Sequence, residues 1–159
     1  MKNRFLNTVL STTLLILSLT LTHAQSATEE VDLYQSLYGM EKKAVLSEFL
    51  GNTVDEGFWA IYEAYEFERK ELGKDRIILL TSYVEDYENI KGDKADEVIR
   101  KAERLNKDQN NLISKYTKKV RKVVGSDVAA QFYQIEHYLL NAIRSEIFEN
   151  LPVIGEIKN

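Results

Sequence analysis

The chain has 159 residues, a formal net charge of −4 and no cysteine. The absence of cysteine excludes disulfides, thiolate nucleophiles and cysteine-ligated metals. The acidic balance argues against a nucleic-acid partner, because nucleic-acid binding depends on Lys and Arg side chains that neutralise phosphates.

The first residues have the layout of a secretory signal peptide. Lys2 and Arg4 precede an apolar run, and Thr22 and Ala24 fit the small-residue positions before a cleavage point. We therefore predict a signal peptide over residues 1–24 and export across the inner membrane into the periplasm. The alternative is an uncleaved anchor helix. Serines and threonines interrupt the run, which disfavours this alternative because a stable span needs ~20 strongly apolar residues.

Residues 25–159 are expected to form a single helical domain without a further membrane span. About 135 residues suffice for one domain that buries roughly two thirds of the surface exposed by its unfolded chain. Loss of Lys2 and Arg4 with the signal peptide takes the basic residues from 21 to 19 against 25 acidic ones, so the exported chain carries about six net negative charges. Such a charge favours solubility.

Composition and hydrophobic periodicity predict an all-α fold. The chain has one proline and seven glycines, and it is rich in Ala, Leu, Glu and Lys. Thr53 and Glu56 form a capping-box signature at the start of the second predicted helix. Long helices with short connections pack antiparallel, so we expect an elongated helical hairpin or four-helix bundle with two long central helices. The four helices are predicted over about residues 31–49, 54–90, 94–124 and 127–150.

The third predicted helix carries a heptad-like seam with one polar break, at Gln109. A structural module that oligomerises through this seam is one hypothesis for the function. The seam consists of Ala95, Val98, Ala102, Leu105, Gln109, Leu112, Tyr116, Val120 and Val123.

The residues that carry enzymatic and metal chemistry are scarce. His23 should leave with the signal peptide, so His137 is the single histidine of the exported chain. A di-iron bundle needs two Glu-x-x-His pairs, but Gln134 stands three residues before His137, and a three-histidine zinc site is equally impossible. Ser126 and Ser145 lie in no Gly-x-Ser-x-Gly elbow. We therefore predict no metal, no cofactor, no catalytic residue and no enzymatic activity.

Polar residues interrupt the apolar faces of the second and fourth predicted helices. Arg69 and Arg76 occur where the apolar side of the second helix would otherwise continue, and Gln134 and Glu136 lie within the apolar run 131–155. We predict that Arg69 or Arg76 meets Gln134 or Glu136 in a polar layer that fixes helix register. The alternative is that these residues line a pocket for a small ligand or cation, in a sensor.

The second predicted helix is also aromatic on more than one face. A stripe of aromatic residues at helical spacing is usually core, which is the interpretation favoured for Phe58, Tyr62 and Tyr65. Trp59 and Phe67 fall off this stripe. Because aromatic residues are favoured at interfaces, Trp59 and Phe67 are the candidate partner surface.

Several blocks carry a resemblance to a known family. The block 129–136, Ala-Ala-Gln-Phe-Tyr-Gln-Ile-Glu, is followed by Leu-Pro-Val at 151–153, and Phe58-Trp59, Tyr62, Tyr65-Glu66 and Glu68-Arg69 precede it. These blocks resemble a family of exported, uncharacterised helical proteins of Gram-negative bacteria. The similarity covers nearly the whole exported chain and implies export and a helical fold.

The chain also bears a looser likeness to the Spy and CpxP group of periplasmic helical chaperones and stress sensors. This likeness lies in size, predicted export and long helices. The Leu-Thr-x-x-Gln signature of that group is missing from residues 25–159, so no binding residue is carried over. We therefore expect a periplasmic, non-enzymatic binding protein of the chaperone or envelope-stress kind. It would contact a protein partner or unfolded client through an amphipathic helical surface.

Overall fold

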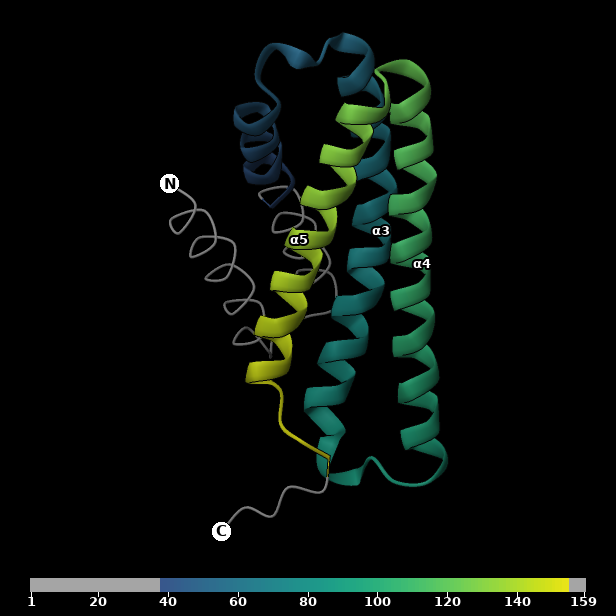
Figure 1. Ribbon diagram of the computed structural model, residues 1–159. Coiled ribbons are helices and arrows are strands. Elements are labelled where there is room, and N and C mark those ends of the chain that lie inside the picture. Colours follow the sequence, from purple (N-terminus) through teal and green to yellow (C-terminus); the bar gives the residue numbers. More distant parts are fainter. Residues whose placement is uncertain (1–37, 155–159) are drawn as a thin grey trace.

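A computed structural model describes residues 38–154, which form a bundle of helices (Figure 1). Residues 38–50 are helical, and helices α3, α4 and α5 follow. The predicted all-α fold is confirmed, since these residues contain no strand. The predicted signal peptide and residues 31–37 of the first predicted helix lie outside the described residues. The elements are η1 (Gly51–Thr53), α3 (Glu56–Asp86), η2 (Tyr87–Asn89), α4 (Asp93–Val123) and α5 (Ser126–Asn150).

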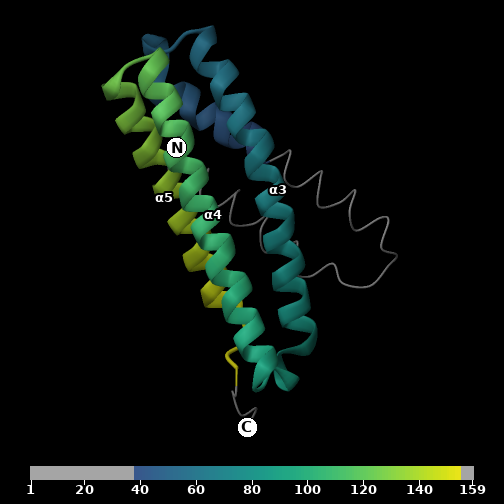
Figure 2. The same cartoon turned by 90° about the vertical axis from the view of Figure 1, so that its right-hand side faces the viewer.

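The three long helices run antiparallel to their neighbours in the chain, and α4 packs against both α3 and α5 (Figures 1 and 2). The helical residues 38–50 lie beside only one half of this bundle, the half that contains the α4–α5 turn (Figure 1). We call it the upper half. The half that contains η2 and the end of α5 is the lower half.

The start of α3 differs from the predicted capping box. Asp55 is the N-cap, and its side chain accepts a hydrogen bond from the Phe58 backbone N–H at 3.2 Å. Thr53 lies in η1 instead, where its hydroxyl donates to the Leu50 carbonyl. A carboxylate at the N-cap accepts hydrogen bonds from free N–H groups of the first turn and interacts favourably with the positive end of the helix. Asp55 therefore has the capping role that was predicted for Thr53.

The other helix boundaries follow from glycines that adopt positive φ angles. Gly92 (φ 54°) precedes α4 and Gly125 (φ 108°) precedes α5, conformations that glycine adopts without steric cost. Asp93 and Ser126 are therefore the first helical residues of α4 and α5. Helix α3 runs through Gly73 without a break.

The main hydrophobic core lies in the upper half. The Tyr65 ring contacts Tyr116 of α4 and Phe132 of α5, with centroid distances of 5.4 and 5.3 Å. Five members of the predicted α4 seam are buried, from Leu105 to Val120. The core consists of Leu46, Leu50, Phe58, Tyr62, Tyr65, Leu112, Ile113, Tyr116, Val120, Val128, Ala129 and Phe132.

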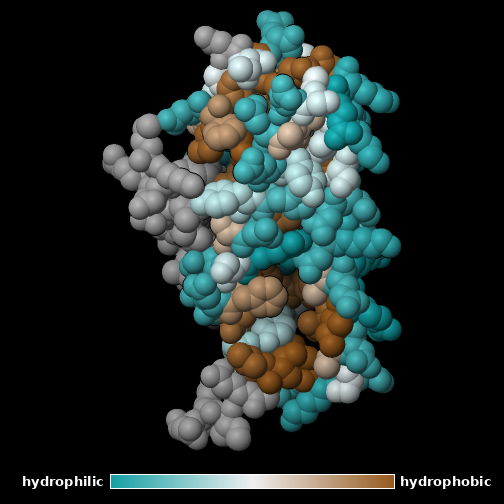
Figure 3. Space-filling view, viewed as in Figure 1, coloured by the Kyte–Doolittle hydropathy of each residue, from teal (hydrophilic) through white to brown (hydrophobic). Residues whose placement is uncertain are grey.

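Apolar side chains are also exposed in the lower half. Figure 3 shows hydrophobic residues gathered over the lower ends of α3 and α5. Phe148 and Val153 are 76% and 65% exposed there. The Tyr83 hydroxyl fixes the segment after α5 by donating to the Pro152 carbonyl at 2.5 Å. Within residues 38–154, none of the helices is both long and apolar enough to span a bilayer.

Candidate functional site

A buried ionic cluster occupies the upper half of the bundle. The Lys42 ammonium lies 2.6 Å from Glu66 Oε1 and 2.7 Å from Glu136 Oε2. The three side chains come from residues 38–50, α3 and α5, and their exposed fractions are 1%, 11% and 3%. One cation therefore joins two carboxylates from different helices in an environment that excludes water.

Arg69 and Tyr65 complete what we call the Lys42 cluster, which consists of Lys42, Tyr65, Glu66, Arg69 and Glu136. Arg69 Nε lies 2.9 Å from Glu66 Oε2, and the Tyr65 hydroxyl donates to Glu136 Oε2 at 2.5 Å. Two cations and two carboxylates thus face each other. Buried charges require such compensation, because a single unpaired charge in this setting is strongly destabilising.

Aromatic rings enclose both cations. Lys42 Nζ lies 4.7 Å from the ring centroid of Tyr65 and 5.6 Å from that of Tyr62, and Arg69 Cζ lies 4.7 Å from the Tyr38 centroid. Rings at these distances attract a cation through their quadrupole. Gly39 allows the helix of residues 38–50 to lie close to α3, because a Cβ atom at this position would lie only 3.0 Å from Glu66 Oε2.

The pKa values of the two carboxylates in the Lys42 cluster are shifted in opposite directions. Burial raises the pKa of Glu66, but Lys42 and Arg69 outweigh it and hold this pKa below its usual value. Burial also raises the pKa of Glu136, and there Lys42 compensates only in part. Burial lowers the pKa of Lys42, yet Glu136 and Glu66 together hold it above its usual value. The cluster therefore keeps Lys42 charged and opposes titration of Glu66.

The four residues of the predicted polar layer have different positions. Arg69 and Glu136 both belong to the Lys42 cluster, where their ion-pair partners are Glu66 and Lys42. Gln134 is exposed. Arg76 lies further along α3, and its Nη2 donates to Asn106 Oδ1 of α4 at 3.0 Å.

Sequence reasoning missed Lys42, the cation at the centre of the cluster. Lys42 lies one turn before Leu46 and two turns before Leu50, and both leucines are buried. The spacing of four therefore placed Lys42 on the buried face of its helix. Lysine is rarely fully buried, so residue type argued against what the spacing indicated.

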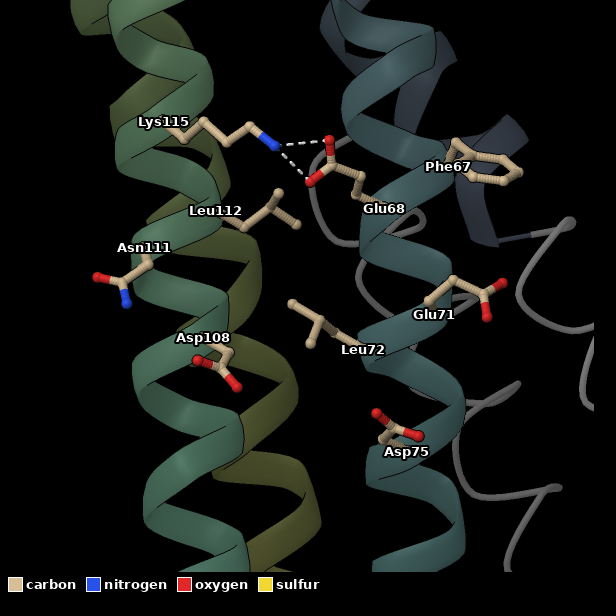
Figure 4. Close-up of a pocket in the computed structure, with 9 residues that line it drawn as sticks. All are labelled: Phe67, Glu68, Glu71, Leu72, Asp75, Asp108, Asn111, Leu112 and Lys115. Carbon is tan, nitrogen blue, oxygen red and sulfur yellow. Dashed lines mark hydrogen bonds and ion pairs between the residues drawn. The ribbon is translucent and has the colours of Figure 1, made fainter.

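A groove of about 550 Å³ lies between α3 and α4 on the surface of the bundle (Figure 4). Figure 4 shows Leu72 and Leu112 pointing into the gap between the two helices. Lys115 reaches across to Glu68, with 2.7 Å from its Nζ to either carboxylate oxygen. The groove is lined by Phe67, Glu68, Glu71, Leu72, Asp75, Asp108, Asn111, Leu112 and Lys115.

The two residues of the predicted partner surface also differ in position. Phe67 belongs to the groove lining, on the side of α3 turned away from α4, and is 71% exposed. Trp59 is half-buried and packs on the core, with centroid distances of 5.0 Å to Phe58 and 5.8 Å to Tyr62. Lys43 Nζ lies 5.3 Å from the Trp59 ring centroid. Only Phe67 presents most of its surface to solvent.

In the part of the chain that the structure describes, no three His, Cys, Asp or Glu residues are grouped so as to hold a metal ion. Comparison of the chain with protein-family models, with curated proteins and with solved structures finds no match.

Proposed function

We propose that this protein is an exported, non-enzymatic binding protein that holds basic, apolar-bearing segments of partner or unfolded proteins in the α3–α4 groove. The observation that carries this proposal is the lining of the groove. Four carboxylates, one ammonium group and two leucines line the groove, and the exposed Phe67 borders it on the side of α3 that is turned away from α4. The predicted signal peptide supports a periplasmic location.

The charges of the groove favour a basic partner. Glu68 is paired with Lys115, while Glu71 lies 3.2 Å from Lys74 and Asp108 lies 3.7 Å from Arg104. Exposed ion pairs of this kind contribute only ~0–1 kcal/mol to stability. Cationic groups of a partner can therefore take the place of the lysine and arginine side chains in these pairs. Leu72 and Leu112, which point into the gap between α3 and α4, add apolar lining beside these carboxylates. Charge and apolar surface are thus available to the same short segment.

The Lys42 cluster serves this function indirectly. Its charged groups come from residues 38–50, α3 and α5, and the ion pairs and hydrogen bonds described above join them to one another. We propose that it fixes the register of these helices and holds α3 in place as one wall of the groove. This role follows the polar-layer hypothesis, with Lys42 as the central cation.

Changing the groove should weaken binding of a labelled peptide that alternates lysine and leucine. Phe67→Ser should raise the Kd about tenfold, because a well-placed aromatic residue contributes 1 kcal/mol or more at an interface. Glu71→Lys with Asp75→Lys should have an effect of similar size by reversing two charges. Fluorescence anisotropy against peptide concentration measures both.

The matched control is Glu85→Lys with Glu103→Lys, which makes the same change in net charge at exposed positions outside the groove. This control should bind the peptide nearly as tightly as the wild type. Equal binding of a glutamate-leucine peptide, or equal weakening by the control pair, would contradict the groove as the binding surface.

A chaperone role is the stricter form of the proposal. Purified protein in several-fold excess should slow aggregation of a basic unfolded client, as measured by light scattering, and Phe67→Ser should reduce this protection. If the protein binds the peptide but does not slow aggregation of the client, the chaperone role is excluded and a role in binding a folded partner remains.

A further inference from the structure

Two arginines of the lower half of the bundle lie close enough for the charge of one, Arg144, to lower the pKa of the other, Arg76. Arg76 lies on α3 and Arg144 on α5, and both are half-buried. Arg76 is hydrogen-bonded to Asn106 of α4. The three long helices thus each contribute one hydrogen-bonding side chain to this layer, which we call the arginine layer.

Arg144 has two donors that the described residues leave without an acceptor. Its Nε and Nη2 atoms are inaccessible to solvent, and neither has a hydrogen-bond partner among the described residues. Buried N–H groups are almost always hydrogen-bonded, and an ionised donor without a partner costs more than a neutral one. These two atoms are on the same edge of the guanidinium, which is the edge that binds an oxyanion in a bidentate manner.

Among the described residues, the arginine layer also lacks a counter-charge. No carboxylate of residues 38–154 pairs with either guanidinium, whereas Arg69, two turns before Arg76 on α3, lies against Glu66. Burial lowers the pKa of Arg76, and the charge of Arg144 lowers it further. Two cations therefore repel each other in a partly desolvated layer of an acidic protein.

We propose that the arginine layer binds a phosphate-type oxyanion between Arg76 and Arg144. Such an anion would supply both the missing hydrogen-bond acceptors and the missing negative charge. Arg76 and Arg144 are both half-buried residues, so the arginine layer lies near the surface of the bundle and not in its core.

A tetrahedral oxyanion fits this layer better than a carboxylate does. Each guanidinium presents its N–H groups as a planar fork that takes up two oxygens. A carboxylate has two oxygens and is satisfied by one fork. Phosphate has enough oxygens for two forks from different helices, and its charge of about −1.5 near neutral pH offsets most of the charge of two cations. This site is made of other residues than the α3–α4 groove, so the inference stands apart from the proposed function.

Thermal unfolding in inorganic phosphate, with potassium chloride adjusted to constant ionic strength, tests the site. Binding to the folded state alone stabilises it by mass action, so the Tm of the purified protein should rise by several degrees and then saturate. Acetate at the same ionic strength should give a clearly smaller rise. Absence of a phosphate-specific rise would overturn the proposal.

Variants of Arg144 separate binding from folding. Arg144→Met should abolish the phosphate-dependent rise without lowering the Tm in chloride, because it removes an uncompensated charge. Arg144→Lys keeps the charge but loses the fork, so its rise should be reduced. Arg100→Met, at an exposed position on α4, is the matched control and should keep the full rise. An undiminished rise in Arg144→Met would assign the effect to phosphate elsewhere and overturn the site.

A phosphate group can belong to a free ion or to a lipid headgroup, and a vesicle assay distinguishes the two sources. Co-sedimentation with phosphatidic acid vesicles, whose headgroup is a phosphate monoester, that depends on Arg144 and that inorganic phosphate competes away would indicate a headgroup. A phosphate-dependent rise in Tm without vesicle binding would indicate a soluble ligand. Both results support the phosphate site.

Discussion

Replacing Lys42 with methionine is expected to lower the free energy of unfolding by about 3 to 5 kcal/mol, the largest effect of any single substitution considered for this protein. The reason is that Lys42 alone bridges Glu66 and Glu136, at 2.6 and 2.7 Å. Without it, Arg69 still faces Glu66, but among the described residues Glu136 keeps only the Tyr65 hydroxyl. Urea unfolding monitored by circular dichroism measures the change.

Lys43→Met is the matched control, because the neighbouring lysine makes a similar ion pair at the surface. Lys43 lies 2.9 Å from Glu63, but their side chains are 44% and 67% exposed. Such a pair contributes about 1 kcal/mol or less. Equal losses in Lys42→Met and Lys43→Met would show that the Lys42 cluster is not buried in solution.

A double substitution identifies the origin of the loss. Glu136→Gln removes the carboxylate that Lys42→Met would leave uncompensated, so the double variant should be more stable than the sum of the two single effects predicts. Residues that share one ionic network show coupling energies of about 0.5 to 3 kcal/mol. Additive losses would instead indicate that Lys42 acts through the packing of its aliphatic chain.

The helical fold could be predicted because local signals agree along the chain. The seam of α4 recurs at spacings of three and four, and its buried members run from Leu105 to Val120. The ends of the helices were harder to predict, because several neighbouring residues are suitable caps. Thr53 and Asp55 both suit the start of α3, and the chain uses Asp55.

The site was predictable only in part, for geometric reasons. Gln134 and Glu136 are two positions apart, so a helix points them to nearly opposite sides, and only Glu136 is buried. Arg69 and Arg76 are seven apart, so they share a face but lie two turns from each other and belong to different layers. Pairing across helices depends on packing. Periodicity within one helix therefore could not show that Lys42 is the partner of Glu136.

Raising the pH above about 10 should destabilise the protein much more steeply than it would a bundle with solvated lysines and tyrosines. Burial and Glu136 hold the pKa of Tyr65 well above 10.0. Glu136 and Glu66 outweigh burial and hold the pKa of Lys42 above 10.5. Burial and Glu68 raise the pKa of Tyr116 to about 12. The folded protein therefore keeps protons that the unfolded chain releases.

This difference in bound protons determines that the free energy of unfolding falls as the pH rises. Each of these groups has a folded-state pKa above its unfolded value, so its contribution is complete below about pH 10 and is lost as the pH rises through the folded-state value. Each proton retained only by the folded state contributes a slope of about 1 kcal/mol per pH unit. Urea unfolding between about pH 8 and pH 12 measures the summed slope.

Tyr65→Phe removes one of these protons and should make the decline above about pH 10 shallower by the slope of one group. The same change at Tyr133, a residue that is 45% exposed, is the matched control. Loss of the Tyr65 hydroxyl also takes a hydrogen bond from Glu136, so Tyr65→Phe should be less stable at neutral pH. A decline as steep in Tyr65→Phe as in the wild type would mean that Tyr65 loses its proton without unfolding the protein, which a buried Lys42 cluster does not permit.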